Sequence, residues 1–386
     1  MTAPITSTVD STTSETYALI VGGGTAGHVL PGVAIGRELV RRGHDASSIH
    51  FVGSERGVEK TLVPDAGFEL TVLPGRGIQR KLTSQNIASV IGLLKAFATS
   101  FGLLRSHKPK VVVALGGYAS VPAGLWAVLL RAPIVVAEQN AVPGLANSII
   151  GRFAKVSAVS YEGTDLPRAV WTGNPVRPEI LAIADDRHGA RTVARTKLGI
   201  AENKLLLVVF GGSLGARTIN NAVVGALPAL ASRSDLEIRH IIGKRDFADV
   251  TNRATLPDGA GLTYTPIEYE DDMASVYAAA DLVVCRAGAT SCAELAVTGT
   301  PAVLIPLPGA PGDHQTENAR ALERAGGAEL LADKIFDDVL LVDTVSRLLA
   351  TESVLETMRS GVDAVARPDA ATAVVDLVEK FGGQHG

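Results

Sequence analysis

The sequence predicts an α/β protein built from two similar halves, each a doubly wound parallel sheet. Two apolar, β-branched runs, at 17–21 and 205–210, each end directly in a glycine-rich loop. The loops lie about half a chain apart in a chain of 386 residues, which is too long for one ordinary hydrophobic core. Hydrophobic residues make up 46% of the chain and aromatic residues only 4%. The cores must therefore consist mainly of Val, Leu, Ile and Ala, as in parallel sheets buried on both faces.

The first half of the chain alternates apolar runs with helical patterns. A helix is expected over 29–42, because its apolar residues recur at helical spacing and would face a sheet. These residues are Val29, Val33, Ile35, Leu39 and Val40. The expected strands lie at 17–22, 49–53, 69–73, 110–115, 133–137, 156–160 and 169–171. Strand–helix alternation of this kind predicts a parallel, doubly wound sheet.

The second half repeats this plan, with strands expected near 204–210, 237–242, 262–265, 281–284, 301–305 and 328–331. Two prolines and a glycine in residues 173–178 interrupt any regular element, so the domain boundary is placed there. We expect an N-terminal domain over 17–175, a C-terminal domain over 176–366 and a last segment, 367–386, with a helix over 369–381. The pattern leaves open whether that helix packs on the second domain or crosses back to the first.

Composition narrows the class of protein. The net charge of −4 argues against general affinity for nucleic acid. Cys285 and Cys292 form no metal or disulfide pattern, which fits a reducing cytoplasm. Residues 1–16 are rich in Ser and Thr and are expected to be a disordered tail, not a signal peptide. No uncharged apolar run reaches the roughly 20 residues that span a bilayer.

Glycines follow four of the expected strands, at 22–27, 116–117, 211–215 and 287–288. Ligands of doubly wound sheets bind beyond the carboxyl ends of the strands. Free backbone N–H groups at a helix start also suit a phosphate. We therefore expect an active site between the two domains.

A nicotinamide or flavin enzyme is the obvious alternative, because Gly22, Gly24 and Gly27 fit the G-x-G-x-x-G pattern. That fingerprint also needs an acidic residue at the end of the second strand to hold the ribose. Here the second strand ends at 52–54, and Glu55 lies only just beyond it. A dehydrogenase would also not need the second glycine loop, so this alternative is disfavoured.

Three residues near the loops are candidates for chemistry. His28 follows the first loop at a helix start, which disfavours imidazolium and leaves a neutral base at pH 7, although an isolated histidine is more often structural. Ser213 in the second loop could bind an anion, cap the helix, or do both. Arg177 could pair with a diphosphate from the hinge, although most arginines are simply solvated.

The stretch 287–294 opens a further helix, for which two interpretations remain. Ser291 and Glu294 are spaced as a capping box, or Glu294 accepts hydrogen bonds from a ribose diol. Residues 313–318 supply amides that suit sugar hydroxyls, but polar loop residues are usually solvated. The acidic pairs at 185–186 and 271–272 lack a third ligand, so we interpret them as surface charge and expect no metal site.

Several stretches, taken in order, resemble the MurG family of peptidoglycan N-acetylglucosaminyltransferases. They are residues 23–28 (GGTAGH), 116–122 (GGYASVP), 138–140 (EQN), 173–177 (GNPVR) and 211–216 (GGSLGA). The resemblance continues through 271–273 (DDM), 285–289 (CRAGA), Gln315 and Asn318. No single motif is decisive, but their joint order covers nearly the whole chain and is highly specific.

The resemblance implies a GT-B fold of two facing Rossmann-like domains, with a last helix that returns to the first domain. It also implies inverting transfer of N-acetylglucosamine from UDP-GlcNAc to the muramyl 4-hydroxyl of undecaprenyl-diphosphate-linked MurNAc-pentapeptide, without cofactor or metal. His28 would be the candidate base. The implied substrate contacts are Thr25, Ala26, Gly27, Asn140, Arg177, Ser213, Ala289, Thr290, Ser291, Glu294, Gln315 and Asn318. The implied acceptor loop comprises Gly116, Gly117, Tyr118 and Ser120.

Three positions depart from the family pattern. Ala26 stands where many members have glycine, which narrows the loop but keeps its N–H. Glu270 replaces an often apolar residue near the uracil, so its backbone would make that contact. Thr290-Ser291-Cys292 replaces a more usual Leu/Met-Thr-Val, so Ser291 would stand in for threonine. These changes keep the groups expected to bind UDP-GlcNAc. They affect mainly the packing around its uracil.

A basic segment between residues 76 and 110 contains no Asp or Glu and many apolar residues. It predicts either an amphipathic surface on an anionic membrane, through residues around 80–105, or a core helix with a solvated basic face. Taken alone, the two are evenly matched, and a lipid-linked acceptor favours the membrane. The expected location is therefore the cytoplasmic face of the membrane, as a peripheral protein.

Two other functions fit the same loops. One is a different UDP-GlcNAc-dependent GT-B enzyme, such as a natural-product glycosyltransferase or a 2-epimerase, which should lack the Gly-Gly-Tyr-x-Ser loop. The other is a non-catalytic nucleotide-sugar sensor, which would need neither His28 nor a basic membrane face.

Overall fold

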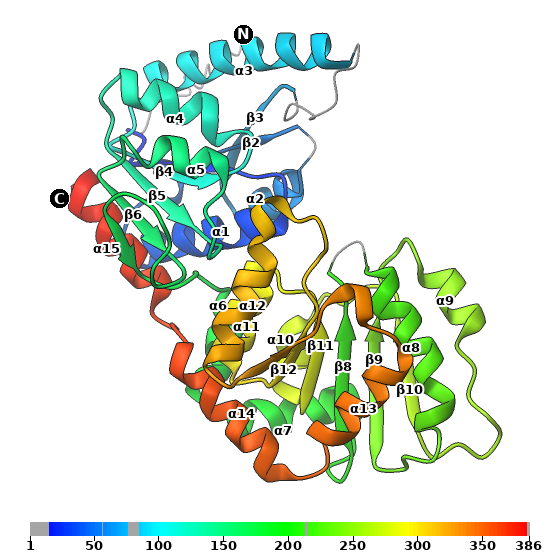
Figure 1. Cartoon of the computed structure of the whole chain (residues 1–386). Coiled ribbons are helices and arrows are strands. Elements are labelled where there is room, and N and C mark those ends of the chain that lie inside the picture. Colours follow the sequence, from blue (N-terminus) through cyan, green and yellow to red (C-terminus); the bar gives the residue numbers. More distant parts are fainter. Residues whose placement is uncertain (1–14, 56, 76–84, 213–214, 384–386) are drawn as a thin grey trace, which may run out of the picture.

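The N-terminal domain is built on a seven-stranded sheet whose strands are all parallel (Figure 1). The computed structural model describes residues 15–55, 57–75, 85–212 and 215–383, with backbone only for 85–90. The strand order is β3-β2-β1-β4-β5-β6-β7. The order therefore reverses between β1 and β4, which is where ligands of such sheets bind. The strands are β1 Ala18–Gly22, β2 Ile49–Ser54, β3 Glu69–Leu73, β4 Val111–Gly116, β5 Ile134–Glu138, β6 Val156–Val159 and β7 Ala169–Trp171.

Helices cover both faces of this sheet. On one face lie α1 Ala26–Arg41 and α2 Glu59–Asp65, and on the other α3 Gln85–His107, α4 Ser120–Leu129 and α5 Leu145–Ile150. Helix α1 begins three residues before the predicted start, at the glycine loop itself. Four of its five predicted core residues are buried, but Val40 is 39% exposed, so its predicted place against the sheet is wrong.

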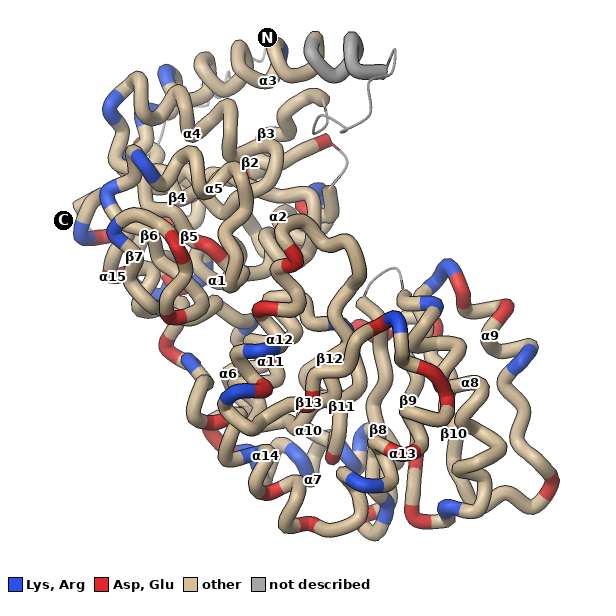
Figure 2. The backbone as a smooth tube through the Cα atoms, viewed as in Figure 1, with Lys and Arg blue, Asp and Glu red and all other residues tan. Residues whose placement is uncertain are grey.

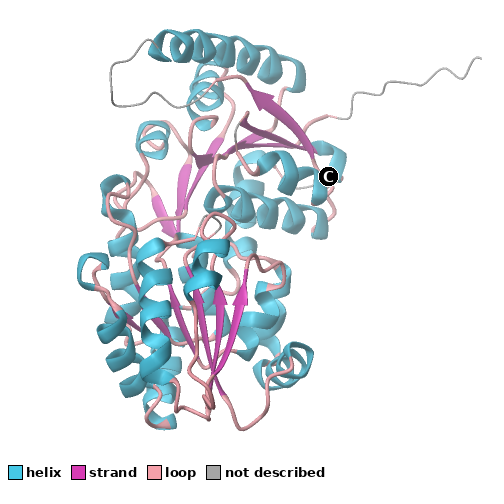
Figure 3. Ribbon diagram, turned by 90° about the vertical axis from the view of Figure 1, so that its right-hand side faces the viewer, coloured by secondary structure: helices cyan, strands magenta, loops and turns pink. Residues whose placement is uncertain are grey.

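The C-terminal domain repeats the plan with six parallel strands in the order β10-β9-β8-β11-β12-β13. These are β8 Leu205–Phe210, β9 Leu236–Ile241, β10 Thr263–Ile267, β11 Leu282–Cys285, β12 Ala302–Leu304 and β13 Ala328–Leu330. One face carries α6 Pro178–Asp185, α7 Arg187–Leu198, α10 Met273–Ala279, α11 Ala289–Thr298 and α12 His314–Arg324. The other carries α8 Arg217–Leu230, α13 Asp338–Leu348 and the start of α14 Glu352–Val365, with α9 Phe247–Arg253 beside α8. Figure 3 shows the strands of this domain running toward the other domain.

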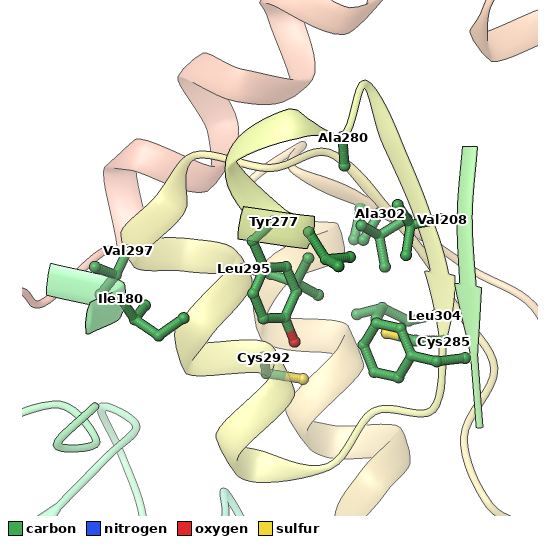
Figure 4. Close-up of a cluster of buried hydrophobic side chains, with 14 of the residues drawn as sticks. Ile180, Val208, Tyr277, Ala280, Cys285, Cys292, Leu295, Val297, Ala302 and Leu304 are labelled. Atoms are coloured by element: carbon green, nitrogen blue, oxygen red, sulfur yellow. The ribbon is translucent and has the colours of Figure 1, made fainter. Parts of the chain in front are cut away.

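The core between the C-terminal sheet and helices α10 and α11 contains both cysteines as free thiols (Figure 4). Tyr277 fills the centre of this cluster, where its side chain is 2% exposed. Burial raises the pKa of both thiols, so neither is a thiolate at neutral pH. These cysteines serve packing.

Two of the four paired aspartates cap helices. Asp186 accepts a hydrogen bond from the backbone N–H of Gly189 at the start of α7, and Asp272 accepts one from Ser275 at the start of α10. These carboxylates lie at the surface, as expected, and one member of each pair also caps a helix. The amino end of a helix favours a carboxylate, which explains why an aspartate stands at the start of each of these two helices.

The chain crosses between the domains twice. The first crossing is residues 172–177, and the second is residues 366–369, which lead into α15 Ala370–Gly382. Helix α15 packs on the N-terminal sheet through buried Val374, Val375 and Val378 (Figure 1). Arg42, the residue that follows α1, holds it through ion pairs to Asp376 and Glu379 at 2.7 and 2.8 Å. The helix that the pattern left unplaced therefore completes the core of the first domain.

Candidate active site

The first glycine loop joins β1 to α1 at the edge of the N-terminal sheet. Thr25, the residue before the helix, has an extended backbone, and no side chain caps the helix. The first turn of α1 therefore presents its positive end to the interdomain cleft. A side chain built on Gly27 would lie 3.9 Å from the Thr290 hydroxyl oxygen at the start of α11. The amino ends of α1 and α11, one from each domain, thus face each other.

A buried carboxylate lies directly beneath this loop. Glu59, the first residue of α2, is 1% exposed and accepts hydrogen bonds from the N–H groups of Gly24 and Ser54 and from the Ser54 hydroxyl. A Cβ at Gly23 or Gly53 would lie within 2.4 Å of the Glu59 side chain. The glycines therefore make room for an internal anion. Sequence reasoning missed Glu59, although it follows β2 and its glycines directly.

Glu59 changes the meaning of the first loop. We expected the loop N–H groups as a whole to be free for a phosphate, but the Gly24 N–H already donates to this carboxylate. At the helix start, His28 and Val29 donate to the Thr25 carbonyl, which leaves the N–H groups of Ala26 and Gly27 without a partner among the described residues. The Glu59 carboxylate thus orients the loop from inside the protein. The remaining N–H groups could bind a phosphate from the cleft.

His28 lies in the first turn of α1, where its Nδ1 is 3.0 Å from the Thr25 hydroxyl oxygen. Its Nε2 approaches the end of β4, because a Cβ at Gly116 would lie 3.4 Å from it. Burial lowers the pKa of His28 below its ordinary value of 6.5, and His314 across the cleft lowers it further, while Glu138 and Glu59 act in the opposite direction. His28 is therefore neutral at pH 7. If Nδ1 donates to Thr25, Nε2 is left as the proton acceptor.

The predicted acceptor loop is held by its own side chains. The Ser120 hydroxyl is fully buried, accepts from the Gly116 N–H and lies 2.8 Å from the Val21 carbonyl oxygen. The Tyr118 hydroxyl donates to the Pro74 carbonyl. A Cβ at Gly117 would lie 2.5 Å from the Gly23 carbonyl oxygen, so the two glycine loops touch. Ser120 thus locks β1 to β4, and its hydroxyl faces the protein interior.

Glu138 and Asn147 form a polar cluster behind His28. Glu138 is 3% exposed and accepts from the N–H groups of Asn140 and Gly144 and from the Asn147 amide. A Cβ at Gly116 would lie 3.2 Å from that Asn147 amide nitrogen. Glu138 therefore fixes the loop that carries Asn140 toward the cleft. The EQN stretch drew attention to Asn140, whereas the glutamate beside it does the positioning.

The second glycine loop joins β8 to α8, and Ser213 lies outside the described residues. Gly215 has φ of +73° and lies so close to the Ile242 carbonyl oxygen that a Cβ would come within 2.2 Å of it. Asn220 donates to the same carbonyl and bonds the fully buried His240, whose pKa burial lowers to about 3. A neutral histidine therefore supports this loop from behind, as Glu59 supports the first.

Helix α11 presents its amino end to the cleft with no capping side chain. It begins at Ala289 after Gly288, so Ser291 lies inside the helix and the capping-box interpretation is wrong. Glu294, 4% exposed, accepts from Arg177 at 3.1 and 2.8 Å and also bonds the Tyr277 hydroxyl. Burial raises the pKa of Glu294, and Arg177 opposes that shift. Arg177 was expected to bind the diphosphate of the sugar nucleotide and Glu294 its ribose, and the structure joins the two side chains in one ion pair.

Asn318 and Gln315 on α12 differ in which amide groups remain available to hydrogen-bond a ligand. Asn318 is fully buried, accepts from the Ala141 N–H and donates to the Asn140 side chain and the Ala287 carbonyl. It joins the domains, and both N–H groups of its amide are used within the described part of the chain, so only its oxygen could accept a further hydrogen bond. Gln315 uses only its oxygen, which accepts from the Leu307 N–H, so its amide NH₂ remains a donor.

Glu270, the expected departure near the uracil, is held by Arg239 at 2.7 Å and accepts from the Asp272 N–H. Its carboxylate is thus committed within the protein, which leaves its backbone as the group that could meet a base. Among the described residues, no three His, Cys, Asp or Glu side chains are grouped to hold a metal ion.

Two parallel-sheet domains that face each other across a cleft, each with a glycine loop at its edge, define the GT-B class of glycosyltransferases. Residues 18–159 match the glycosyltransferase family 28 N-terminal domain, and residues 206–374 match its C-terminal domain. The chain belongs to glycosyltransferase family 28 and, by its full-length relatives, to the MurG family.

The relatives share nearly their whole length with this chain. The UDP-N-acetylglucosamine--N-acetylmuramyl-(pentapeptide) pyrophosphoryl-undecaprenol N-acetylglucosamine transferase of Myxococcus xanthus is 38% identical, over 95% of this chain and 94% of its own. That of Caldanaerobacter subterraneus is 36% identical, over 94% and 98%. Crystalline MurG of Acinetobacter baumannii is 30% identical, with a TM-score of 0.73 over 94% and 99%. A UDP-GlcNAc 2-epimerase of Neisseria meningitidis is 12% identical with a TM-score of 0.64, over 94% and 99%, and so shares the fold alone.

Proposed function

We propose that this protein transfers N-acetylglucosamine from UDP-GlcNAc to the 4-hydroxyl of the muramyl sugar in undecaprenyl-diphosphate-linked MurNAc-pentapeptide. The product is the complete lipid-linked disaccharide precursor of peptidoglycan, and the anomeric configuration inverts. The observation that carries the proposal is identity of 36–38% with transferases of this name over nearly the whole of both chains. The 2-epimerase alternative rests on fold alone and is not favoured.

The donor is proposed to bind in the C-terminal half of the cleft. The uncapped start of α11, at Ala289, Thr290 and Ser291, and the second glycine loop offer N–H groups to the diphosphate. The Arg177–Glu294 pair acts as a unit, because each side chain orients the other: Glu294 faces the ribose and Arg177 the diphosphate. The free amide NH₂ of Gln315 suits a sugar hydroxyl. Ser213 and Asn140 keep their predicted donor roles, whereas Asn318 holds the domains together.

His28 is proposed to accept the proton. The muramyl oxygen forms its bond to the anomeric carbon while the bond from that carbon to UDP breaks, and UDP leaves with the electron pair. The proton of the attacking hydroxyl goes to Nε2 of His28, which is neutral for this purpose. Negative charge grows on the leaving diphosphate, where the helix-end N–H groups and Arg177 stabilise it most. The proposal includes no metal and no cofactor.

The acceptor is proposed to reach the site from a membrane surface. Helix α3 shows Lys and Arg and no acidic residue along its described length (Figure 2). Ile91, Leu94 and Phe101 are exposed beside Lys95, as expected for a helix that lies on anionic lipid. Predicted basic residues at 76–84 lie outside the described residues. Among the described residues, no helix is long and apolar enough to cross a bilayer. A peripheral position on the cytoplasmic face follows from this proposal.

A radiolabel assay tests the function. The purified protein is mixed with labelled UDP-GlcNAc and a lipid-linked muramyl-pentapeptide analogue, and transfer to the lipid is measured by extraction. We expect label in the lipid fraction and equimolar UDP release. UDP-GlcNAc binding with no transfer to the analogue would contradict the proposal, and formation of UDP-ManNAc would instead identify a 2-epimerase.

A further inference from the structure

An open groove of about 570 Å³ runs beside helix α5 in the N-terminal domain. One wall is the loop 141–143 before the helix, and the other is residues 163–167, which follow β6. Ser148 lines the groove from α5 and Arg152 from the turn after it. Binding clefts commonly measure about 300–1,000 Å³, so this groove is large enough for a ligand.

The groove shares a loop with the candidate active site. At the start of that loop the Asn140 side chain accepts a hydrogen bond from Asn318 of the C-terminal domain, and the next three residues line the groove. A Cβ at Gly312 would lie 3.3 Å from Val142, so the loop also touches the C-terminal domain beside α12. The groove therefore begins at the rim of the cleft.

Both walls are fixed by hydrogen bonds and packing. The Gly144 N–H donates to buried Glu138, which holds the loop, and the Ser157 hydroxyl donates to the Pro167 carbonyl of the opposite wall. Leu166 in that wall is 7% exposed and belongs to the core of the domain. A preformed groove of this kind spares a ligand the cost of ordering its site.

Two exposed charges of opposite sign line the groove, Arg152 and Asp165. Within the described part of the chain neither side chain has an ion-pair partner. A guanidinium with unused N–H groups can bind a carboxylate through two parallel hydrogen bonds. An aspartate can accept from the N–H groups of a peptide backbone. The charges therefore suit a peptide that ends in a carboxylate.

The length of the groove suits a pentapeptide. Helix α5 begins near the cleft, and Arg152 lies beyond its other end. From Gly144 to Arg152 the chain advances by roughly 12 Å at the helical rise. Five extended residues span at most roughly 17 Å. A peptide that enters at the rim of the cleft can thus bring its last residue to Arg152.

The groove also lies on the right side of the domain for such a peptide. Helices α3, α4 and α5 cover one face of the sheet, and α4 contacts both of the others. Residues 163–167 flank α5 beyond β6, at the side away from α3. An acceptor whose lipid lies at α3 would therefore extend its peptide in the opposite direction. In a muramyl-pentapeptide the peptide is attached beside the 4-hydroxyl, so it must leave the cleft close to the reacting atoms.

We propose that this groove binds the peptide of the lipid-linked acceptor and that Arg152 receives its C-terminal carboxylate. Asp165 on the opposite wall accepts from the N–H groups of the peptide. The inference rests on the proposed function, which supplies the muramyl-pentapeptide, and adds the place where its peptide lies. The groove takes no part in the chemical step, so it acts on the affinity for the acceptor and not on kcat.

Two acceptor analogues with the same lipid and sugar test the pairing, one with a free C-terminal carboxylate and one with a C-terminal carboxamide. Arg152→Gln should raise KM for the carboxylate analogue roughly threefold to tenfold, because the pair is partly solvated. KM for the carboxamide analogue, KM for UDP-GlcNAc and kcat should stay unchanged. Lys155→Gln removes an exposed charge just before β6, at the sheet edge away from the cleft, and should behave as the parent. An equal rise with both analogues, or no rise with either, would overturn the role of Arg152.

A second variant tests the groove without using a charge. Ser148 is half-buried and donates only to the Gly144 carbonyl, so Ser148→Phe fills the groove at an unchanged melting temperature. It should raise KM severalfold for the pentapeptide acceptor and leave KM unchanged for an acceptor whose peptide is cut to its first residue. Equal changes of KM for the two acceptors would contradict the proposal.

A soluble muramyl-pentapeptide without lipid separates failure of this inference from failure of the proposed function. Its binding to the parent protein, measured by ligand-observed NMR, requires no transfer. Binding that Arg152→Gln and Ser148→Phe both weaken would support the groove even in a protein that transfers nothing. Transfer by a parent protein with equal KM for the pentapeptide acceptor and the shortened one would overturn the groove and leave the proposed function standing.

Discussion

At the scale of single residues, the loops of the candidate site are held by buried carboxylates behind them. Glu59 and Glu138 are both buried, and each accepts hydrogen bonds from the backbone of a loop that faces the cleft. Both also raise the pKa of His28 against the larger effect of burial. The surroundings of His28, the proposed base, are therefore shaped by acidic side chains behind it.

His28→Ala removes the proposed base and should lower kcat by about 10²–10⁴-fold, the usual contribution of a positioned base. UDP affinity should be nearly unchanged, because Arg177 and the start of α11 lie on the other domain. The measurement is steady-state transfer together with calorimetric UDP binding. Full turnover by the variant would remove His28 from the mechanism.

The pH profile tests the same residue independently. A base works in its neutral form, so the rate falls as the pH drops through its pKa. Because burial lowers the pKa of His28 below 6.5, the acid limb of kcat/KM should have its midpoint below pH 6.5. His28→Gln should lose that limb along with most of its activity. An acid limb that persists unchanged in the variant would assign it to another group.

Glu59→Gln tests the internal anion. The new NH₂ would face N–H and O–H donors where a carboxylate accepted them, at a cost of about 1–3 kcal/mol. The loop should shift, and kcat/KM for the lipid-linked acceptor should fall about tenfold or more while UDP affinity stays. Exposed Glu55→Gln, four residues earlier, is the control and should behave as the parent. Equal activity of the two variants would show that Glu59 only fills space.

At this scale the sequence predicts which residues belong to the candidate site better than it predicts which residues they contact. The first glycine loop drew attention to His28, the hinge to Arg177, and the family resemblance to Thr25. The structure pairs Thr25 with His28 and Arg177 with Glu294. Glu59 could not be chosen, because nothing in a single sequence distinguishes a buried glutamate from the many exposed ones. The pairing of Arg177 with Glu294, 117 positions away, is set by tertiary packing alone.

At the scale of elements, α3 carries an apolar face that the protein does not cover. Ala96 and Leu104 are buried against the sheet, whereas Leu94 is 66% exposed and Ile91 50%. The sequence pattern could not distinguish a core helix from a helix on the membrane surface, because this segment contains enough apolar residues for either location. The structure shows that the helix has an inner and an outer apolar side.

Leu94→Glu should weaken binding to vesicles that contain anionic lipid by about tenfold or more, because a charge replaces apolar area that would enter the bilayer interface. Binding of the parent protein should also fall with added salt, since the basic residues are screened. The measurement is vesicle cosedimentation. Val339→Glu, on a 71% exposed site of α13 in the other domain, is the matched control. Equal losses in both variants would speak against α3 as the contact.

The strands were predictable element by element because each is a short apolar run bounded by glycine, proline or polar residues. All thirteen expected strands among the described residues are present within two residues of their predicted ends. Helix starts were less predictable: α1 and α11 both begin earlier than their apolar or capping patterns indicated. At both places the helix starts on a glycine loop without a capping side chain, so the usual start signal is missing.

At the scale of the whole molecule, the links between the domains within the described part of the chain include two crossings, the buried Asn318 and the exposed ion pair Arg37–Glu179 at 3.5 Å. The sequence predicted two domains but not where the last helix would dock. Periodicity shows that a helix has an apolar face and contains no information on which of two similar sheets it will cover.

Removal of residues 367–386 should destabilise the N-terminal domain selectively. Val374, Val375 and Val378 would be lost from its core, each worth about 1.5–3 kcal/mol when fully buried. We expect a lower first melting transition, loss of transfer, and retained UDP binding by the C-terminal domain. The conservative variant Arg42→Lys keeps the charge but cannot reach Glu38, Asp376 and Glu379 at once, so it should show a smaller shift. An unchanged first transition in the truncated protein would contradict the role of α15.

The position of α15 also sets the order in which the molecule can be completed during synthesis. The ribosome finishes β7 about 200 residues before it reaches α15, which takes roughly 10–40 s at 5–20 residues per second. Throughout that interval one face of the first sheet lacks one of its covering helices, and the second domain is completed before α15 is made. The domain that is made first is therefore the last to mature, and nascent chains are most exposed to aggregation through the half that will hold His28.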